Sequence, residues 1–300
     1  MAAGAIVALA AGFSRGAVPE PGLLFHASFD KFTTAADSAA GSRQPIQGSP
    51  VDLQLRMNPD VKGGTMTEGN SVSLTNPEML TYPMAGNMRP NRGTVSFWTK
   101  MVNHSLGDGK YYPVFFQAEM RGFTMLVYKY GPEPDKLLFW MNVGGSLVGG
   151  GQVYQRTVSA RWREGEWHKV DITWDNMSMG LYIDGAAAHV LALDPPENFP
   201  TAVAEGGFFS LNRAKGWQSG DGRTTDFDEL KIYDRKLSAA EIYAAFAKVR
   251  PDLAAKVARP DAAAEEPPRL VYQCFPARQA LGVRLDTDAL PGGGAVKARL

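Results

Sequence analysis

The sequence predicts an all-β fold, an antiparallel sandwich or barrel that is followed by one short helix. Between residues 22 and 211, apolar and polar side chains alternate over short runs, which is the pattern of half-buried strands. Clusters of Gly, Pro, Asn and Asp separate these runs, as turns do in sandwiches and barrels. Because strand and helix patterns do not alternate regularly, a parallel α/β fold is not expected.

Eight alternating runs are expected to form strands, in this order: residues 23–29, 72–74, 95–98, 123–128, 137–143, 168–174, 181–183 and 208–211. The run at 181–183 leads into Asp184-Gly185, a dipeptide typical of a tight hairpin turn. In the run at 137–143 both faces are bulky, because Leu138 and Trp140 lie between other large apolar residues. This strand is therefore expected inside a large two-sheet stack.

The last strand and the helix are predicted together near residue 228. Leu230 and Ile232 share one face of the strand, which stops at Asp234. Ser238 is followed three residues later by Glu241, the spacing of a capping box at a helix start. The apolar residues that follow at helical spacing are Ile242, Phe246 and Val249.

Composition divides the chain into four parts. Residues 22–249 form the predicted sandwich, and residues 250–268, rich in Pro, Ala and charge, are interpreted as a linker. Residues 269–300 again show strand patterns, but about thirty residues cannot bury a domain core alone. They are interpreted as the start of a truncated second β-domain, so the chain is expected to be a fragment of a larger protein. The alternative is a tail that packs back on the sandwich.

Charge and cysteine content exclude several classes of function. Lys and Arg number 31, as do Asp and Glu, so the formal net charge is zero. This balance gives no basis for binding nucleic acid or an anionic membrane surface. Cys274 is the only cysteine, which excludes an intrachain disulfide and a multi-cysteine metal site.

The N-terminal residues 1–21 are interpreted as a signal peptide. Residues 2–13 form an apolar run that is shorter than the roughly 20 residues a membrane-spanning helix needs but suits a signal-peptide core. We therefore expect the protein to be exported to the cell envelope, the periplasm or the medium. The run lacks a preceding Lys or Arg, so the alternative is an alanine-rich disordered terminus. We expect no integral membrane segment in the remainder of the chain.

Five local patterns occur in the order in which laminin-G-like domains of the concanavalin A-like superfamily use them. They are LFHASFD (24–30) with DSAAG (37–41), GTVSFW (93–98), GEWHKVDITW (165–174), LYIDG (181–185) and DELKIYDRKLSAAEI (228–242). The resemblance covers residues 22–249 and implies a two-sheet antiparallel jelly-roll sandwich. The chain departs from the family at Lys169, where a second histidine is frequent.

The resemblance also implies a function, a non-catalytic module that binds carbohydrate or another extracellular polymer within a larger exported protein. Two alternatives stay open. One is a protein-interaction or adhesion domain. The other is an accessory domain of a glycoside-active enzyme whose catalytic domain is absent from this chain.

No catalytic residue is predicted. The related jelly-roll glucanases carry a Glu-x-Asp-x-x-Glu strand whose carboxylates act as nucleophile and acid/base. The nearest acidic cluster here is Asp226, Asp228 and Glu229, and no third carboxylate follows at that spacing. The histidines also lack the spacing of a zinc-hydrolase motif.

Calcium is the one cofactor that the resemblance implies, bound between the opening segment and the closing strand. Asp30 and Asp228 match those positions, and Asp37 matches less closely. Calcium takes several oxygen ligands, often both carboxylates and carbonyls. The alternative is that Asp30 caps a turn and Asp228 accepts hydrogen bonds from nearby backbone amides.

Two loops have the composition of a sugar-binding site, residues 104–112 and 212–223. Trp217 is the best single candidate for stacking on a sugar ring, because its neighbours are polar residues or Gly. The other candidate ligand-binding residues are Arg213, Asp221, Tyr111 and Tyr112. The alternative is that Trp217 folds back over a sheet edge. The strand tryptophans, expected mainly in the core, are Trp98, Trp140, Trp167 and Trp174.

Overall fold

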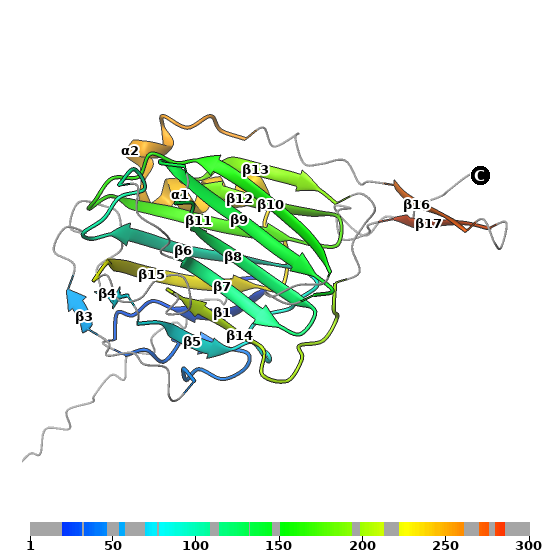
Figure 1. Cartoon of the computed structure of the whole chain (residues 1–300), viewed down its shortest axis with the longest axis horizontal. Helices are drawn as coiled ribbons and strands as arrows, with labels where there is room; N and C mark the ends of the chain where they lie inside the picture. Colours follow the sequence, from blue (N-terminus) through cyan, green and yellow to red (C-terminus); the bar gives the residue numbers. More distant parts are fainter. Residues whose placement is uncertain are drawn as a thin grey trace, which may run out of the picture.

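The computed structural model describes residues 20–31, 33–46, 54–57, 70–76, 78–108, 114–131, 133–145, 151–193, 199–212, 222–260, 270–275 and 280–285. Two antiparallel sheets pack face to face, and a helix follows the last strand of the sandwich (Figure 1). The predicted all-β jelly-roll sandwich is therefore confirmed.

The larger sheet has nine strands in the order β13-β12-β11-β6-β15-β1-β2, with β4 also paired to β15 and β3 to β4. Its strands are β1 (Leu23–Ala27), β2 (Ser38–Ala39), β3 (Gln54–Met57), β4 (Asn70–Thr75), β6 (Gly93–Met101), β11 (Trp167–Trp174), β12 (Ser178–Ile183), β13 (Ala186–Ala192) and β15 (Thr224–Tyr233). The long strands β6, β11 and β15 at its centre carry three of the five family-like segments.

The smaller sheet has six strands in the order β10-β9-β8-β7-β14-β5. Its strands are β5 (Leu80–Pro83), β7 (Val114–Met120), β8 (Phe123–Lys129), β9 (Lys136–Val143), β10 (Gln152–Ser159) and β14 (Phe208–Leu211). Near the C-terminus, β16 (Leu270–Phe275) and β17 (Ala280–Leu285) pair with each other in a separate two-stranded sheet.

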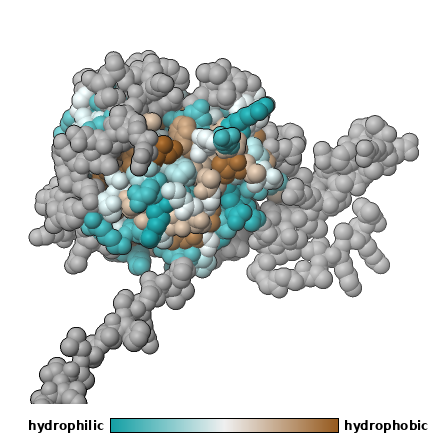
Figure 2. All heavy atoms as spheres, turned by 90° about the horizontal axis from the view of Figure 1, so that it is seen from below, coloured by the Kyte–Doolittle hydropathy of each residue, from teal (hydrophilic) through white to brown (hydrophobic). Residues whose placement is uncertain are grey.

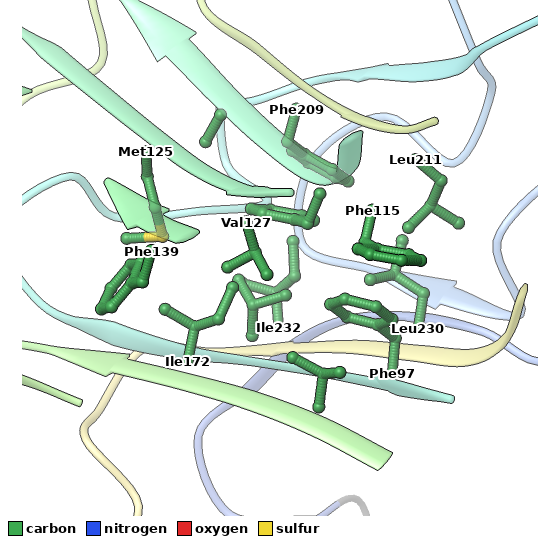
Figure 3. Close-up of a cluster of buried hydrophobic side chains, with 14 of the residues drawn as sticks. Phe97, Phe115, Met125, Val127, Phe139, Ile172, Phe209, Leu211, Leu230 and Ile232 are labelled. Atoms are coloured by element: carbon green, nitrogen blue, oxygen red, sulfur yellow. The ribbon is translucent and has the colours of Figure 1, made fainter. Parts of the chain in front are cut away.

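The hydrophobic core fills the space between the two sheets. Every second residue of each strand points inward, so Phe97 and Ile172 of the larger sheet and Val127 and Phe209 of the smaller one lie in the same core (Figure 3). The Phe25 ring lies 5.2 Å from the Phe209 ring, edge to face. On the side of the molecule seen in Figure 2, hydrophobic and hydrophilic residues are interspersed.

Helix α1 (Ala239–Val249) begins with the predicted capping box. The backbone N–H of Glu241 donates to Ser238 Oγ at 3.2 Å, and the N–H of Ser238 donates to Glu241 Oε2 at 2.8 Å. Arg235 donates to both carboxylate oxygens of Glu241, at 3.0 and 2.7 Å. These bonds fix the angle at which the chain leaves β15 and enters the helix.

We expect the stability that Glu241 provides to depend on pH. The hydrogen bonds from Arg235 hold the pKa of Glu241 below its ordinary value of 4.5. A lowered carboxyl pKa stabilises the fold above the unfolded-state pKa, and this contribution is lost as the pH falls through the folded-state pKa. Glu241→Gln should therefore cost up to about 1 kcal/mol near pH 7 and nearly nothing at a pH well below the lowered pKa of Glu241. Urea unfolding at both pH values measures this, and a cost that persists in acid would contradict it.

The packed structure extends beyond the predicted end of the sandwich at Val249. A short helix, α2 (Pro251–Ala254), follows α1 directly. Leu253, Ala254 and Val257 pack with Phe246 against two tryptophans of the larger sheet. The sequence reading of 250–268 as a linker missed this, because three small or medium apolar residues do not stand out in a Pro- and Ala-rich segment. Residues 261–268, and residues 1–19 of the predicted signal peptide, lie outside the described residues.

Within the ranges that the structure describes, no helix combines the length and the apolar character needed to cross a membrane.

Candidate functional site

The predicted sugar-binding residues lie outside the described part of the chain. They are Tyr111, Tyr112, Arg213, Trp217 and Asp221. Whether Trp217 offers a platform to a sugar or covers a sheet edge therefore stays a prediction.

The structure does bring the ends of the two predicted loops together. Asn103, just before the first loop, donates through Nδ2 to the carbonyl of Gly222, at the end of the second, at 2.9 Å. Its Oδ1 accepts from the N–H of Thr224 at 2.8 Å. His104 Nε2 lies 3.1 Å from the hydroxyl of Thr225. Two segments about 120 residues apart in the sequence thus share one end of the sandwich.

A buried lysine anchors the first loop to the smaller sheet. Lys129, at the end of β8, has a side chain that is 1% exposed. Its Nζ donates to the carbonyl of Ser105 at 2.6 Å and forms an ion pair with Asp108. A buried cation is costly unless it is paired and hydrogen-bonded, so these contacts hold residues 105–108 in one place.

The outer face of the smaller sheet carries an aromatic surface that the sequence analysis did not identify. Leu126, Trp140 and Gln155 are direct neighbours across β8, β9 and β10, and Tyr128, Leu138 and Thr157 form the next row. Their strand neighbours Val127 and Phe139 point into the core, so by alternation these side chains point outward. We call the outward residues Leu126, Tyr128, Leu138, Trp140, Val153, Gln155 and Thr157 the Trp140 patch.

The Trp140 patch combines partly exposed aromatic side chains with exposed polar side chains. Trp140 and Tyr128 are partly exposed, and Gln155 and Thr157 are exposed. Leu126 and Leu138 are buried, yet neither belongs to the core between the sheets. They form an apolar base beside the two aromatic rings. Exposed aromatic side chains next to amide and hydroxyl groups can take up both the C–H face and the hydroxyls of a sugar.

Next to the patch, several polar residues of this outer face are closed to solvent. Gln117 and Ser210 continue the Leu126 row on β7 and β14, and Thr124 precedes Leu126 by two positions on β8; all three are buried. Gln117 Nε2 donates to Glu119 Oε2 at 2.7 Å. The most exposed residues among these rows are therefore those of the Trp140 patch on β9 and β10.

The patch begins at the same end of the sheet as the two predicted loops. The first loop ends at residue 112, two positions before Val114, which pairs with Tyr128 of the patch. The second loop follows Leu211, which pairs with Phe116 on the same strand as Val114. The ends of the two loops are therefore next to Tyr128, which lies at the same end of the sheet, and Trp140 lies further along it.

The other strand tryptophans are buried, as the sequence predicts. Trp174 is fully buried and donates through Nε1 to the carbonyl of Pro90 at 3.0 Å. Trp98 and Trp167 pack under α1. Trp140 differs because it lies on the outer side of a strand whose two faces are both bulky, and only the pairing with β8 and β10 distinguishes the faces.

Asp30 and Asp228, the two predicted calcium ligands, lie in one acidic corner of the larger sheet. Asp228 precedes a β-bulge in β15, where Glu229 adopts a left-handed φ of 50°. Asp228 Oδ1 accepts from the N–H of Glu229 at 2.7 Å, and Asp30 Oδ1 accepts from the N–H of Asn70 at 3.1 Å. The Asp228 contact is of the kind that the alternative to a calcium site predicts, whereas Asp30 bonds to a residue 40 positions away and not within a turn.

The raised pKa values of two carboxyl groups and one unpaired oxygen atom are consistent with a cation at this corner. Burial, with the charges of Glu229, Asp30 and Asp226, raises the pKa of Asp228 well above its ordinary value. Burial and the charges of Glu229 and Asp37 likewise raise the pKa of Asp30. Asn70 donates to the carbonyl of Asp30 at 2.9 Å, but its Oδ1 is buried and has no hydrogen-bond partner in the described structure. Buried carboxylates and an unpaired carbonyl oxygen are ligands that calcium accepts.

Asp37 fits such a site less well than the other two. Its carboxylate lies 2.9 Å from Lys31 Nζ and accepts from the N–H of Ser28 at 2.8 Å. Despite burial, these contacts lower the pKa of Asp37 to about 2. Among the described residues, no three or more His, Cys, Asp and Glu side chains are grouped as a metal site. A cation at this corner would therefore need Asn70 and backbone oxygens beside Asp30 and Asp228.

The acidic cluster on β15 is not arranged for acid/base chemistry. Asp226 is buried, forms an ion pair with Lys100 at 3.1 Å and accepts from the hydroxyl of Ser73. Asp228 is also buried. A glycosidase needs two carboxylates that face the scissile bond, and these two are enclosed by their own contacts.

Comparison with known families gives a match over most of the sandwich. Residues 69–243 match the model of a laminin-G-like family described as the concanavalin A-like lectin/glucanases superfamily. No curated protein sequence matches the chain.

Solved structures of binding domains share the fold at low sequence identity. The ligand binding domain of botulinum neurotoxin serotype D, in complex with N-acetylneuraminic acid, is 11% identical with a TM-score of 0.56, over 75% of this chain and 50% of that one. The binding domain of Paraclostridial Mosquitocidal Protein 1 is 13% identical with a TM-score of 0.54, over 75% and 52%. The chain thus spans about half the length of these toxin domains.

A second kind of structural neighbour has nearly the same extent as this sandwich. It is domain 4 of AbnA, an extracellular GH43 arabinanase from Geobacillus stearothermophilus, in complex with arabinotriose. That domain is 18% identical with a TM-score of 0.54, over 73% of this chain and 96% of the domain.

Proposed function

The chain belongs to the laminin-G-like family of the concanavalin A-like lectin/glucanases superfamily, and from this we propose that it is a non-catalytic module that binds a glycan or a similar extracellular polymer. The observation that carries the proposal is the Trp140 patch, where partly exposed Trp140 and Tyr128 lie beside exposed Gln155. The two loops predicted from the sequence would extend this surface at the end of the sheet. Two structural neighbours are in complex with sugars, which supports the same class of ligand.

The physical basis is the match between the patch and a sugar ring. A pyranose or furanose ring has an apolar C–H face that packs on an aromatic ring, and its hydroxyls need hydrogen-bond partners at the edge. Trp140 offers the ring, Leu126 and Leu138 offer the apolar base, and Gln155 and Thr157 offer polar groups. As an accessory domain of a larger exported protein, the module would hold that protein on its polymer.

A glycan array probed with this chain tests the proposal. We expect binding to at least one polysaccharide or oligosaccharide class. If no glycan binds, the proposal is wrong.

A protein-interaction or adhesion domain is the second candidate, and one observation favours it. Val153 and Val190 are 42% and 38% exposed, and they lie on β10 and β13, the edge strands of the two sheets. An exposed edge strand can pair with a strand of another chain. Binding of a protein ligand that survives Trp140→Ala but is lost when Pro replaces Val153 or Val190 would favour this function.

We also propose that the acidic corner holds a calcium ion that stabilises the fold, with Asp30, Asn70 and Asp228 as ligands. Bound calcium would neutralise two carboxylates whose charged forms burial disfavours. The melting temperature should then rise with added Ca²⁺ and fall with chelator. At a hundredfold excess of Ca²⁺ over Kd, the free energy of unfolding should increase by about 2.7 kcal/mol. The effect should weaken in acid, because protons compete for the same oxygens.

Asp228→Asn should abolish the calcium effect, because it removes the charge and keeps the shape. Asp234→Asn, which lies just after the end of the same strand and outside the corner, is the matched control and should keep the effect. A melting temperature that is the same with calcium and with chelator would remove the site from the account.

A further inference from the structure

The charges on the outer face of the smaller sheet limit the class of glycan that the Trp140 patch can take. We infer that the patch binds a neutral oligosaccharide and discriminates against sugars that carry a carboxylate or a sulfate. This inference rests on the proposed function and adds a ligand class to it.

The described strands place only two charged residues on this face. They are Glu119 on β7 and Lys136 at the first position of β9. The patch itself has none, since its seven residues are Leu, Tyr, Trp, Val, Gln and Thr. Arg156 of β10 alternates with the patch residues and points to the opposite side, where its charge lowers the pKa of His189 together with burial of that ring.

Both charged residues are distant from Trp140 and already engaged. Lys136 precedes Trp140 by four strand positions, about 13 Å along β9, and its Nζ donates to Ser159 Oγ at 2.9 Å. Glu119 lies two strands from Trp140 and accepts from Gln117. At physiological ionic strength, exposed charges separated by more than about 8 Å are largely screened.

An anionic sugar stacked on Trp140 would therefore lose hydration without gaining a counter-charge from the described strands of this sheet. Desolvating an ionised carboxylate is costly unless it is paired. A neutral sugar only exchanges hydroxyl–water hydrogen bonds for bonds to groups such as the Gln155 amide. The desolvation cost thus weakens binding of the anionic sugar. Stacking on Trp140 contributes equally to binding of the anionic and the neutral sugar.

The test compares neutral and anionic oligosaccharides on the full chain, at about 20 mM and about 500 mM salt. We expect neutral glycans to bind at least about tenfold more tightly than matched uronate or sialylated glycans, with an affinity that changes less than about twofold with salt. If anionic glycans bind best and lose affinity in high salt, the inference is wrong while the proposed function stands. If no glycan binds, both are wrong.

A charged residue introduced into the Trp140 patch tests whether the patch itself sets the preference for neutral over anionic glycans. Thr157→Lys adds a cation beside Leu138, and it should raise the affinity for anionic glycans several-fold and make it salt-dependent. Gln152→Lys is the matched control, because residue 152 is also exposed on β10 but alternates to the opposite side. An equal gain from both variants, or from neither, would show that the patch does not set the ligand class.

Discussion

Replacing Phe246 with alanine is expected to lower the free energy of unfolding by about 3–5 kcal/mol, the range for a large side chain removed from a core. Phe246 is fully buried, and its ring stacks 5.9 Å from that of Trp98. It also packs on the Asp184-Gly185 hairpin, where a side chain at Gly185 would lie 2.9 Å from the ring. One residue therefore fixes α1 to two separate parts of the larger sheet.

Urea unfolding of Phe246→Ala beside Lys248→Ala measures this effect. Lys248 is exposed on the same helix, so its substitution should change stability by less than about 0.5 kcal/mol. A Phe246→Ala protein as stable as the Lys248→Ala protein would mean that α1 is not part of the cooperative fold.

The buried ion pair between Lys169 and Asp171 should produce the second large effect. Both residues lie on β11, with 5% and 0% of their surface exposed. Asp171 Oδ2 has no hydrogen-bond partner in the part of the chain that the structure describes, so Lys169 is the group that compensates this charge. Lys169→Met would leave an uncompensated carboxylate in the interior, at a cost of about 3–5 kcal/mol.

A double-mutant cycle separates this charge effect from lost packing. Lys169→Met combined with Asp171→Asn removes both charges, so much of the stability lost in Lys169→Met should return. The two costs should therefore be strongly non-additive. Additive costs would indicate that the residues act independently and that the ion pair contributes little.

The sequence alone predicts most of the fold, because apolar and polar side chains alternate clearly along its central strands. The runs that became β6, β11, β12 and β15 could all be recognised, as could the capping box of Ser238 and Glu241. The edge strands β10 and β13 could not. Most residues of β10 are exposed on both faces, and in β13 the three partly buried positions include an Ala and a His, so the apolar and polar sides differ too little to be recognised.

The candidate site was less accessible from the sequence, since it depends on which residues pair. Leu138 and Trp140 alternate with equally bulky residues, so no pattern distinguishes the core side of β9 from the outer side. Asn70 meets Asp30 across 40 residues of chain, and a lone Asn carries no signal of that contact.

The central claim is that Trp140 forms the glycan-binding surface, and titration of Trp140→Ala with a glycan that the wild type binds tests it most directly. We expect the affinity to fall by about 1–3 kcal/mol, by analogy with stacking of bases on aromatic side chains. Stability should fall less than in the core variant Trp174→Ala, for which about 3–5 kcal/mol is expected. An unchanged affinity together with a large loss of stability would contradict the claim and make Trp140 a packing residue.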